Sequence, residues 1–337
     1  MVEIALVGAG KMGLSHLAIL GAHPNVKIVG VCDKSKLVNG VLQKYSGYPC
    51  YTDFVKMLDD AKPQAVFIAV PTKFHYDFVK ILLDRNIHVF VEKPFCLTYA
   101  QSDELSTLAE EKGLVNQVGY HNKFVGTFQE LKRLIKGGYL GNIQHFLGEA
   151  YGPVVIKAKQ ETWRSDPLEG GGCLMDYASH VIDLINDILS PVISSSGSQL
   201  KSIYSNSVDD MVYSLLELSD KTTGNLSVNW SDETYRKMST SLTIFGSKGK
   251  IICDANELRV YFKGNDFPEG YTNGWNVKYI TDLTAQADFY LRGEEYSLQI
   301  DHFVKSVMGV ADKNINTFRS AAHTDKAIEI IKNKSKK

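Results

Sequence analysis

The sequence predicts an α/β domain with a doubly wound parallel sheet, followed by an α+β domain whose sheet is open and mostly antiparallel. In the first part, short β-branched runs alternate with helical segments, which is the pattern of repeated βαβ units. Past residue 124, strand-like runs follow one another with few helices between them, which favours an antiparallel sheet. A chain of 337 residues has room for two cores, so we predict domains at 1–124 and 125–337.

The individual elements follow from these runs in chain order. Strands of the first domain are expected at residues 4–7, 28–32, 65–70, 87–91 and 114–118. Helices between them are expected at 13–21, 34–45, 54–60, 74–85 and 99–111. In the second domain we expect helices at 128–135 and 173–189, and strands at 143–151, 211–218, 225–230, 241–245, 250–253 and 258–262. Two C-terminal helices, at 297–308 and 324–331, fit either domain.

Charge and composition exclude several classes of partner. Lys plus Arg number 37 and Asp plus Glu 38, so the net charge of -1 provides no basic face for nucleic acid or an anionic membrane. Apolar stretches such as 65–70 are far shorter than the roughly 20 residues that span a bilayer. The five cysteines stand singly, without zinc or thiol-exchange spacing, so we predict reduced thiols and no metal. The N-terminus lacks the parts of a secretory signal, and we expect a cytoplasmic protein.

A glycine motif follows the first strand and opens the first helix. It reads Gly8-Ala9-Gly10-Lys11-Met12-Gly13, a complete GxGxxG. In a Rossmann dinucleotide-binding domain, the first glycine permits the tight turn, the second lets the backbone approach the pyrophosphate, and the third allows close helix packing. The N–H groups at the start of the helix bind the phosphates.

Asp33 strengthens this interpretation, because it ends the second strand 20 residues after Gly13. An acidic residue there binds the adenosine ribose hydroxyls and repels a 2′-phosphate, which favours NAD over NADP. Lys34 and Lys36 leave NADP open as the cofactor, since either lysine could offset the charge of Asp33.

Two further strand ends lie at the carboxyl edge of the predicted sheet, where open α/β folds bind ligands. Pro71 and Thr72 follow one strand; Thr72 either lines the dinucleotide site or belongs to a plain turn, and Pro71 has a structural role. Glu92-Lys93-Pro94 follows another buried strand and brings two charged side chains to this edge, which favours a functional use because buried charges need partners. Taken alone, a Glu-Lys pair at a strand end also fits a solvated loop. The proline is a candidate for a cis or strained turn that aims Lys93.

A second constellation lies in the C-terminal half. Trp163-Arg164 precedes three glycines, 170–172, and a helix in which Asp176 and His180 are four residues apart and share one face. Asp183 extends that face. Taken alone, an Asp-His pair at this spacing fits a capped helix with a core histidine, and a metal site would need a third ligand that the sequence does not supply.

Together these motifs resemble the Gfo/Idh/MocA family, which includes glucose-fructose oxidoreductase and inositol dehydrogenase. The resemblance runs over nearly the whole chain, through the glycine motif, Asp33, residues 69–72, Glu92-Lys93-Pro94, Trp163-Arg164 and the Asp176/His180 helix. It implies catalysis by Lys93, Asp176 and His180: His180 as the base, Lys93 stabilising alkoxide charge, and Asp176 holding the substrate or orienting His180.

The motifs and their positions predict which residues bind cofactor and substrate. Cofactor contacts are expected from Gly8, Gly10, Lys11, Met12, Gly13, Asp33, Pro71, Thr72, Glu92 and Lys93. Substrate contacts are expected from Lys93, His121, Lys123, Tyr151, Trp163, Arg164, Asp176 and His180. For His121, Lys123 and Tyr151, near the predicted domain junction, the alternative is interdomain hydrogen bonding or solvent exposure. Two departures from the family pattern, Ala178 in place of a glycine and Lys123 in place of an arginine, leave the mode of substrate anchoring open.

We therefore expect reversible hydride transfer between NAD and a secondary alcohol of a sugar, cyclitol or nucleotide sugar. The alternatives are an NADPH-dependent keto-sugar reductase, a noncatalytic nucleotide sensor and an NAD-dependent glycosidase. One face of the antiparallel sheet has no helices of its own to cover it, so we also expect a homodimer or homotetramer.

Overall fold

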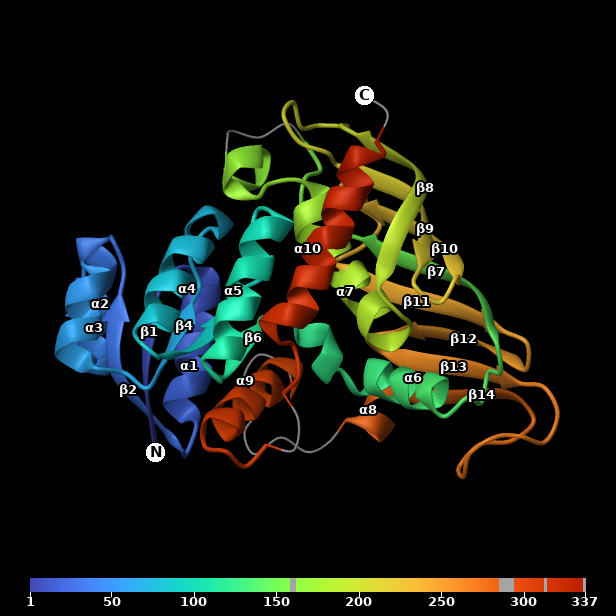
Figure 1. Cartoon of the computed structure of the whole chain (residues 1–337), viewed down its shortest axis with the longest axis horizontal. Coiled ribbons are helices and arrows are strands. Elements are labelled where there is room, and N and C mark those ends of the chain that lie inside the picture. The colour runs from blue at the N-terminus through green and yellow to red at the C-terminus, as the bar shows by residue number, and fades with distance from the viewer. Residues whose placement is uncertain (158–161, 285–293, 312–313, 336–337) are drawn as a thin grey trace. The chain divides into compact units, whose positions relative to one another are not determined.

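The computed structural model describes residues 1–157, 162–284, 294–311 and 314–335 (Figure 1). The chain divides into two compact units. Unit 1 comprises residues 1–121 and 286–322, and unit 2 comprises 122–285 and 323–337. The sequence predicts one boundary, at 124/125, with all later residues in the second domain. In the structure, residues 286–322 belong to unit 1 instead. The described residues contain no helix that is both long and apolar enough to cross a membrane.

Unit 1 is built on a parallel sheet of six strands in the order β3-β2-β1-β4-β5-β6. In chain order the strands are β1 (Val2–Val7), β2 (Val26–Cys32), β3 (Cys50–Tyr51), β4 (Ala65–Ile68), β5 (His88–Val91) and β6 (Asn116–Val118). The central strands are apolar on both faces because helices cover both faces. This architecture confirms the predicted doubly wound fold; the two-residue β3 is the strand that the sequence did not indicate.

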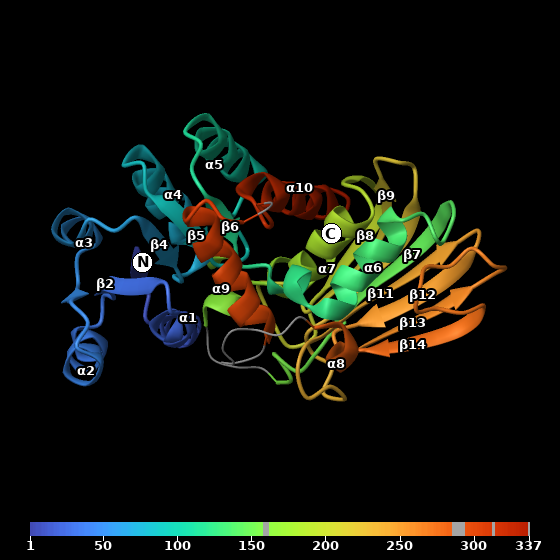
Figure 2. The ribbon, with the colours of Figure 1, turned by 90° about the horizontal axis from the view of Figure 1, so that it is seen from below.

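Helices lie on both sides of this sheet (Figure 2). They are α1 (Lys11–Ala22), α2 (Lys36–Ser46), α3 (Phe54–Ala61), α4 (His75–Asp84) and α5 (Tyr99–Glu111). Apolar side chains of α3, α4 and α5 pack in one core with the sheet, and those of α1 pack in the other. The second core also takes Phe303 from α9 (Glu294–Val307), whose ring lies 5.2 Å from Phe67 and 5.9 Å from Phe90. This packing explains why residues 286–322 belong to unit 1.

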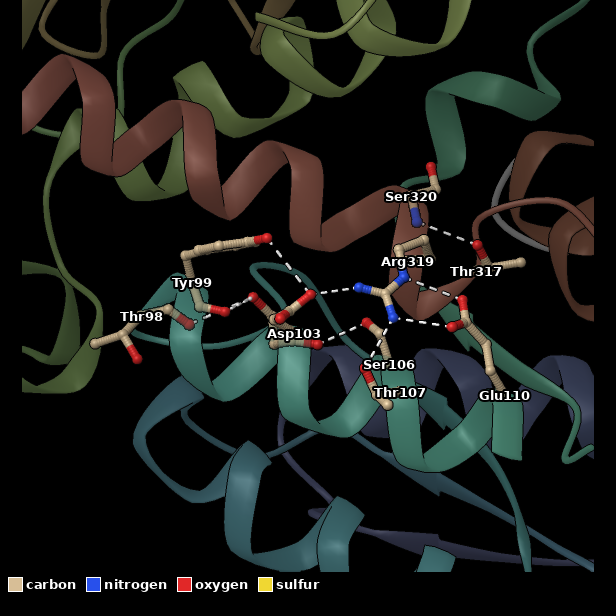
Figure 3. Close-up of polar contacts among 10 residues, drawn as sticks. Thr98, Tyr99, Asp103, Ser106, Thr107, Glu110, Thr317, Arg319 and Ser320 are labelled. Carbon is tan, nitrogen blue, oxygen red and sulfur yellow. Dashed lines mark hydrogen bonds and ion pairs between the residues drawn. The ribbon is translucent and has the colours of Figure 1, made fainter. Parts of the chain in front are cut away.

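The start of α10 (Phe318–Asn333) is also fixed within unit 1. Phe318 stacks on Phe95 at 4.3 Å between ring centroids. The guanidinium of Arg319 lies over α5, where it pairs with Asp103 and Glu110 and donates to Thr107 at 3.0 Å (Figure 3). These three α5 residues share one helix face, so Arg319 joins three successive turns.

Unit 2 contains an eight-stranded sheet in the order β14-β13-β12-β11-β7-β10-β9-β8. Its strands are β7 (Ile143–Tyr151), β8 (Val192–Lys201), β9 (Met211–Leu218), β10 (Thr223–Asn229), β11 (Ser239–Gly246), β12 (Gly249–Asp254), β13 (Glu257–Phe262) and β14 (Gly274–Tyr279). The β7–β10 pair is parallel and the other pairs are antiparallel. The mostly antiparallel sheet is confirmed, with β8 and β14 as strands beyond those expected.

One face of this sheet is covered by helices (Figure 2). They include α6 (Gly126–Lys136) and α7 (Ser179–Ile188), and the four-residue α8 (Ile280–Leu283) packs beside α6. The approach of α7 requires a glycine in β7, because a Cβ on Gly148 would lie 2.7 Å from Val181 and 3.0 Å from Ile185. From His323 onward α10 belongs to unit 2, where Thr324 accepts a hydrogen bond from Asn186 at 3.4 Å.

Candidate active site

The three glycines of the turn between β1 and α1 differ in the space around them. Gly8 has a φ of +89°, and a Cβ there would lie 2.5 Å from the carbonyl oxygen of Ala69. A Cβ on Gly13 would lie 1.8 Å from the carbonyl oxygen of Gly8. Around Gly10, by contrast, no described atom lies within 4 Å of a Cβ position. Gly8 and Gly13 are therefore required by the turn itself. Gly10 leaves open space at the start of α1, where N–H groups and the helix dipole attract an anion.

Asp33 lies directly beside this turn. Its Oδ2 accepts a hydrogen bond from the N–H of Ala9 at 2.8 Å, and its Oδ1 accepts one from the N–H of Ser35 at 2.8 Å. Two backbone donors thus hold one negative charge next to the glycine turn, while Lys34 and Lys36 are exposed. The residues present fit a dinucleotide: open space at a helix N-terminus for its phosphates and an oriented carboxylate for its ribose hydroxyls.

The residues that follow β4 border the same turn. β4 ends at Ile68, two residues earlier than expected, although the N–H of Ala69 still donates to Val7 at 2.8 Å. Pro71 is exposed, and Thr72 is buried at the start of a 3-10 turn, Thr72–Phe74. The carbonyl of Ala69 is the group that excludes a side chain at Gly8, so this strand end and the glycine turn pack as one piece.

Glu92 and Lys93 follow β5, as expected, and the Lys93–Pro94 peptide bond is cis. Glu92 is buried, and its Oε1 lies 2.6 Å from Nε2 of His16, a fully buried residue of α1. Its Oε2 accepts a hydrogen bond from the N–H of Lys93 at 3.2 Å. Both carboxylate oxygens of Glu92, expected to contact the cofactor, are therefore engaged within unit 1.

A second histidine holds the chain just beyond Lys93. Nδ1 of the buried His75, on α4, lies 3.0 Å from the carbonyl oxygens of both Pro94 and Phe95, and its Nε2 lies 2.9 Å from that of Val70. Burial lowers the pKa of His75, and the hydrogen bonds to these carbonyls oppose the shift. His75 and His16 were both missed at the sequence level. The pattern that could have indicated them is a polar residue on the apolar face of each helix.

His121 belongs to unit 1 and follows β6. Its ring stacks on Tyr296 with 4.6 Å between centroids. Because β5 and β6 are parallel neighbours, His121 and Glu92 lie at the same end of the sheet, and the charge of His121 favours the ionised form of Glu92. Of the predicted unit 1 site residues, the structure thus brings together the glycine turn with Asp33, and Glu92 with Lys93 and His121.

In unit 2, Asp176 and His180 are both buried. The predicted helix 173–189 begins with a π-helical turn, Leu174–Ala178, and continues as α7. Nε of Arg164 donates to Oδ2 of Asp176 at 3.2 Å, and the Arg164 guanidinium lies 4.4 Å from the ring centre of Trp163. The structure therefore joins Trp163, Arg164 and Asp176 at the start of the His180 helix, and π-turns of this kind occur often at functional sites.

Lys123 and Tyr151 are placed differently from the other predicted substrate residues. The buried ammonium of Lys123 lies 2.9 Å from Oδ1 of the buried Asp183, one turn beyond His180. Burial raises the pKa of Asp183 to about 6, although Lys123 lowers it. Tyr151 lies on the face of β7 opposite Gly148, which faces α7, and its hydroxyl is 2.7 Å from Ser227. Strand alternation therefore separates Tyr151 from His180.

Among the residues that the structure describes, no three His, Cys, Asp or Glu side chains are grouped so that they could hold a metal ion. All five cysteines are free thiols, and burial raises the pKa of Cys32 to about 11.

The parallel sheet, the glycine turn and Asp33 define a dinucleotide-binding protein with a second, α+β unit. Residues 2–120 match the family model described as an oxidoreductase family with an NAD-binding Rossmann fold. Residues 128–252 match the GFO/IDH/MocA C-terminal domain. The chain belongs to the Gfo/Idh/MocA family of oxidoreductases, as the motifs of the sequence predicted.

Similar proteins include sugar and cyclitol dehydrogenases. The chain is 27% identical over 183 residues to D-glucoside 3-dehydrogenase of Escherichia coli (54% of this chain and 52% of that protein). It is 27% identical over 200 residues to scyllo-inositol 2-dehydrogenase (NAD(+)) of Bacillus subtilis (58% and 56%). The matches thus span about half the length of these curated relatives. A solved levoglucosan dehydrogenase in complex with NADH superimposes with a TM-score of 0.87, 18% identity and coverage of 99% and 96%, which shows a shared fold.

Proposed function

We propose that this chain is an NAD-dependent dehydrogenase that oxidises a secondary alcohol of a sugar or cyclitol ring, reversibly. The observation that carries the proposal is the Asp33 carboxylate, held beside the glycine turn by the N–H groups of Ala9 and Ser35. This arrangement suits a ribose with free hydroxyls and disfavours a 2′-phosphate, so we assign NAD in preference to NADP. The substrate class rests on the named activities of the glucoside and inositol dehydrogenases.

The chain's own residues have separate roles in this proposal. The glycine turn and the start of α1 hold the pyrophosphate, Asp33 holds the ribose, and Lys11, Met12, Pro71 and Thr72 border the dinucleotide. A nicotinamide held there would supply the hydride acceptor for oxidation and, in its reduced form, the hydride donor for the reverse reaction. Glu92 does not contact the cofactor directly in this proposal. Its two oxygens bind His16 and the N–H of Lys93 instead.

The substrate roles rest on the family resemblance and on the chemistry of each residue. His180 removes the hydroxyl proton, because an imidazole titrates closest to neutrality. Lys93 stabilises the developing alkoxide with its positive charge. Asp176 holds a substrate hydroxyl and is itself oriented by Arg164. His121, Trp163 and Arg164 are proposed as further substrate contacts; Lys123 and Tyr151, predicted in that group, have the other partners described above.

The first experiment measures NADH formation when purified protein and NAD are offered free sugars, cyclitols and nucleotide sugars. Lys93→Ala and His180→Ala are expected to lower turnover of the accepted substrate by roughly 10²- to 10⁴-fold. Lys80→Ala, which removes a partly exposed α4 lysine paired with Asp84, serves as the matched control. Turnover that is unchanged in Lys93→Ala would overturn the assigned mechanism.

Other outcomes favour the alternative activities. Reduction of keto-sugars with NADPH alone would identify a reductase. Release of an aglycone without net NADH would identify a glycosidase. Tight NAD binding with no turnover across the panel would identify a sensor.

We further propose that the chain forms a homodimer or homotetramer through the open face of the unit 2 sheet. On this face Tyr213, Leu215, Trp275, Val277 and Tyr279 are between 38% and 56% exposed. They alternate with buried residues on β9 and with less exposed ones on β14, so they line the side of the sheet that α6 and α7 leave uncovered. A second copy would remove this apolar surface from water. A cytoplasmic location stays a prediction from the sequence.

A further inference from the structure

His16, in the middle of α1, and Glu92, just after β5, form a buried polar pair. His16 has no exposed surface, and the centroid of its ring lies 5.3 Å from that of Phe90, on β5, and 5.9 Å from that of Phe67, on β4. Its Nε2 lies 2.6 Å from Oε1 of Glu92. A polar side chain within such an aromatic environment is costly unless it is hydrogen-bonded, so this contact with Glu92 is the interaction that offsets its burial.

The carboxylate of Glu92 is fixed from three sides. His16 contacts one oxygen, and the N–H of Lys93 donates to the other at 3.2 Å. At the end of β6, a Cβ on Gly119 would lie 3.0 Å from both oxygens and from the carboxylate carbon, so the main chain there closes the third side. The orientation of this carboxylate therefore depends on His16, and the main chain of Lys93 depends on the carboxylate.

The titratable groups around Glu92 favour its ionised form. Burial raises the pKa of Glu92, but the hydrogen bond with His16 and the electrostatic interactions with His16, Lys93 and His121 together hold that pKa below its ordinary value. His75, on α4, also interacts electrostatically with Glu92. Removing one partner from a buried charge leaves the charge uncompensated, which is strongly unfavourable. His16, together with Lys93 and His121, therefore favours an ionised carboxylate behind Lys93.

We propose that His16 is a positioning residue, which acts through Glu92 on the main chain of Lys93 and links the cofactor helix to the proposed catalytic lysine. His16 follows Gly13 by one helical turn, so the helix that holds the cofactor phosphates is the helix that holds Glu92. This inference rests on the proposed function, in which Lys93 acts on the substrate.

The test compares two substitutions of His16. His16→Phe keeps a planar ring between Phe67 and Phe90 but removes the hydrogen-bonding nitrogens, and His16→Gln restores a nitrogen near the position of Nε2. A displaced Lys93 should lower kcat by roughly ten- to a hundredfold in His16→Phe, with the affinity for NAD within about threefold of wild type. His16→Gln should recover most of this loss. Should His16→Phe fail to fold, His16→Asn, whose amide is too short to reach Oε1, takes its place.

The pH dependence separates positioning from a purely structural role. Without His16, the effect of burial on Glu92 is opposed less strongly, so the pKa of Glu92 rises, and protonation of Glu92 should steepen the acid limb of the kcat/KM profile that the proposed base His180 already produces. Glu92→Gln, which cannot titrate, should keep only the limb of the proposed base His180. The matched control is His23→Phe, because His23 is another buried histidine of unit 1 paired with a carboxylate, Asp301 at 3.3 Å, but away from Lys93. It should leave the limb in place.

Hydrogen–deuterium exchange provides a readout that needs no turnover. The amide of Lys93 should exchange faster in His16→Phe and return toward the wild-type rate in His16→Gln, with no change in His23→Phe. If Lys93→Ala retains full activity, the proposed function fails, and the exchange result still tests the link. If Lys93→Ala is inactive while His16→Phe keeps wild-type kcat, pH profile and exchange, the positioning role is overturned.

Discussion

The carboxylate of Asp33 is held in one orientation by two backbone N–H groups, of Ala9 and Ser35. A negative charge fixed in this way repels a 2′-phosphate, and like charges about 4 Å apart interact by roughly 4 kcal/mol near a protein surface. Discrimination between the two cofactors should therefore depend on the charge of this residue more than on its shape.

Asp33→Asn tests this dependence, since an amide keeps an oxygen acceptor and removes the charge. We expect the ratio of NADPH to NADH affinity to rise by about tenfold or more, through loss of repulsion toward the 2′-phosphate. Fluorescence titration with each reduced cofactor measures the ratio. Asp53→Asn, at the exposed cap of α3, is the control and should leave the ratio unchanged. A wild type that binds NADPH as tightly as NADH would contradict the assignment.

Asp183 makes a pH-dependent contribution to stability. Burial raises its pKa to about 6 from the ordinary value of 3.8, so between these pH values the folded chain holds a proton that the unfolded chain releases. The stability from this group is present below about pH 4 and is lost as the pH rises through about 6.

Asp183→Asn cannot lose a proton, so the stability advantage of wild type over this variant should shrink by about 3 kcal/mol between pH 4 and pH 7. Urea unfolding at both pH values, compared as differences between the two proteins, isolates this effect from other titrating groups. Asp266→Asn, which changes an exposed carboxylate of unit 2 paired with Lys248, is the control. A difference that stays constant with pH would show that Asp183 has an ordinary pKa.

At the scale of elements, the glycine turn separates folding from cofactor binding. A Cβ on Gly13 would overlap the carbonyl oxygen of Gly8 at 1.8 Å, whereas a Cβ on Gly10 meets no described atom within 4 Å. Gly13 is needed for the packing of α1 on the sheet, and Gly10 is needed so that the pyrophosphate of the cofactor can approach the start of the helix.

Gly13→Ala is therefore expected to lower the melting temperature and to abolish NAD binding. Gly10→Ala should have a free energy of unfolding within about 1 kcal/mol of the wild-type value and so a similar melting temperature. It should bind NAD roughly tenfold or more weakly, because its methyl group occupies the path of the pyrophosphate. Differential scanning fluorimetry and NADH titration measure the two effects. Gly40→Ala, within α2 and in open space, should change neither adversely. Wild-type NAD affinity in Gly10→Ala would show that the phosphates bind elsewhere.

Elements with strong periodicity could be predicted from the sequence, and those with mixed composition could not. The apolar strands β1, β4 and β5 stand out because both of their faces are buried, and β2 stands out through its buried C-terminal half. β8 was missed because residues 192–201 are rich in serine and its register with β9 shifts twice, and β14 because its apolar side chains point to the exposed face.

The candidate site divides in the same way. The glycine turn, Asp33 and Lys93 follow strand ends, and strand order then decides where they lie. His16 and His75 carry no spacing signature, because single histidines on helices acquire partners only through packing. Tyr151 shows the converse: it ends a correctly predicted strand, but the pairing of β7 and the glycine at position 148 decide that it faces away from α7.

At the scale of the whole molecule, membership of a unit is decided by long-range packing. The amphipathic pattern of α9 shows that one face must be buried, but it does not state which core receives Phe303. The same limit applies to the open face of the unit 2 sheet, since a row of exposed apolar residues indicates a partner without fixing its symmetry.

Leu215→Lys tests the proposed assembly. Leu215 is 55% exposed in β9, so a lysine there should cost the monomer less than about 1 kcal/mol. In an assembly that covers this face, the same lysine would bury an unpaired charge, which is far more costly, so dissociation should occur at much higher protein concentration. Sedimentation equilibrium across a concentration series measures the shift. Leu37→Lys, on α2 in unit 1 and 78% exposed, is the matched control and should sediment as wild type does. If Leu215→Lys and wild type dissociate at the same concentration, the open face is not the interface; if both are monomers throughout, the apolar residues of β9 and β14 tolerate water, and the proposal of a homo-oligomer is withdrawn.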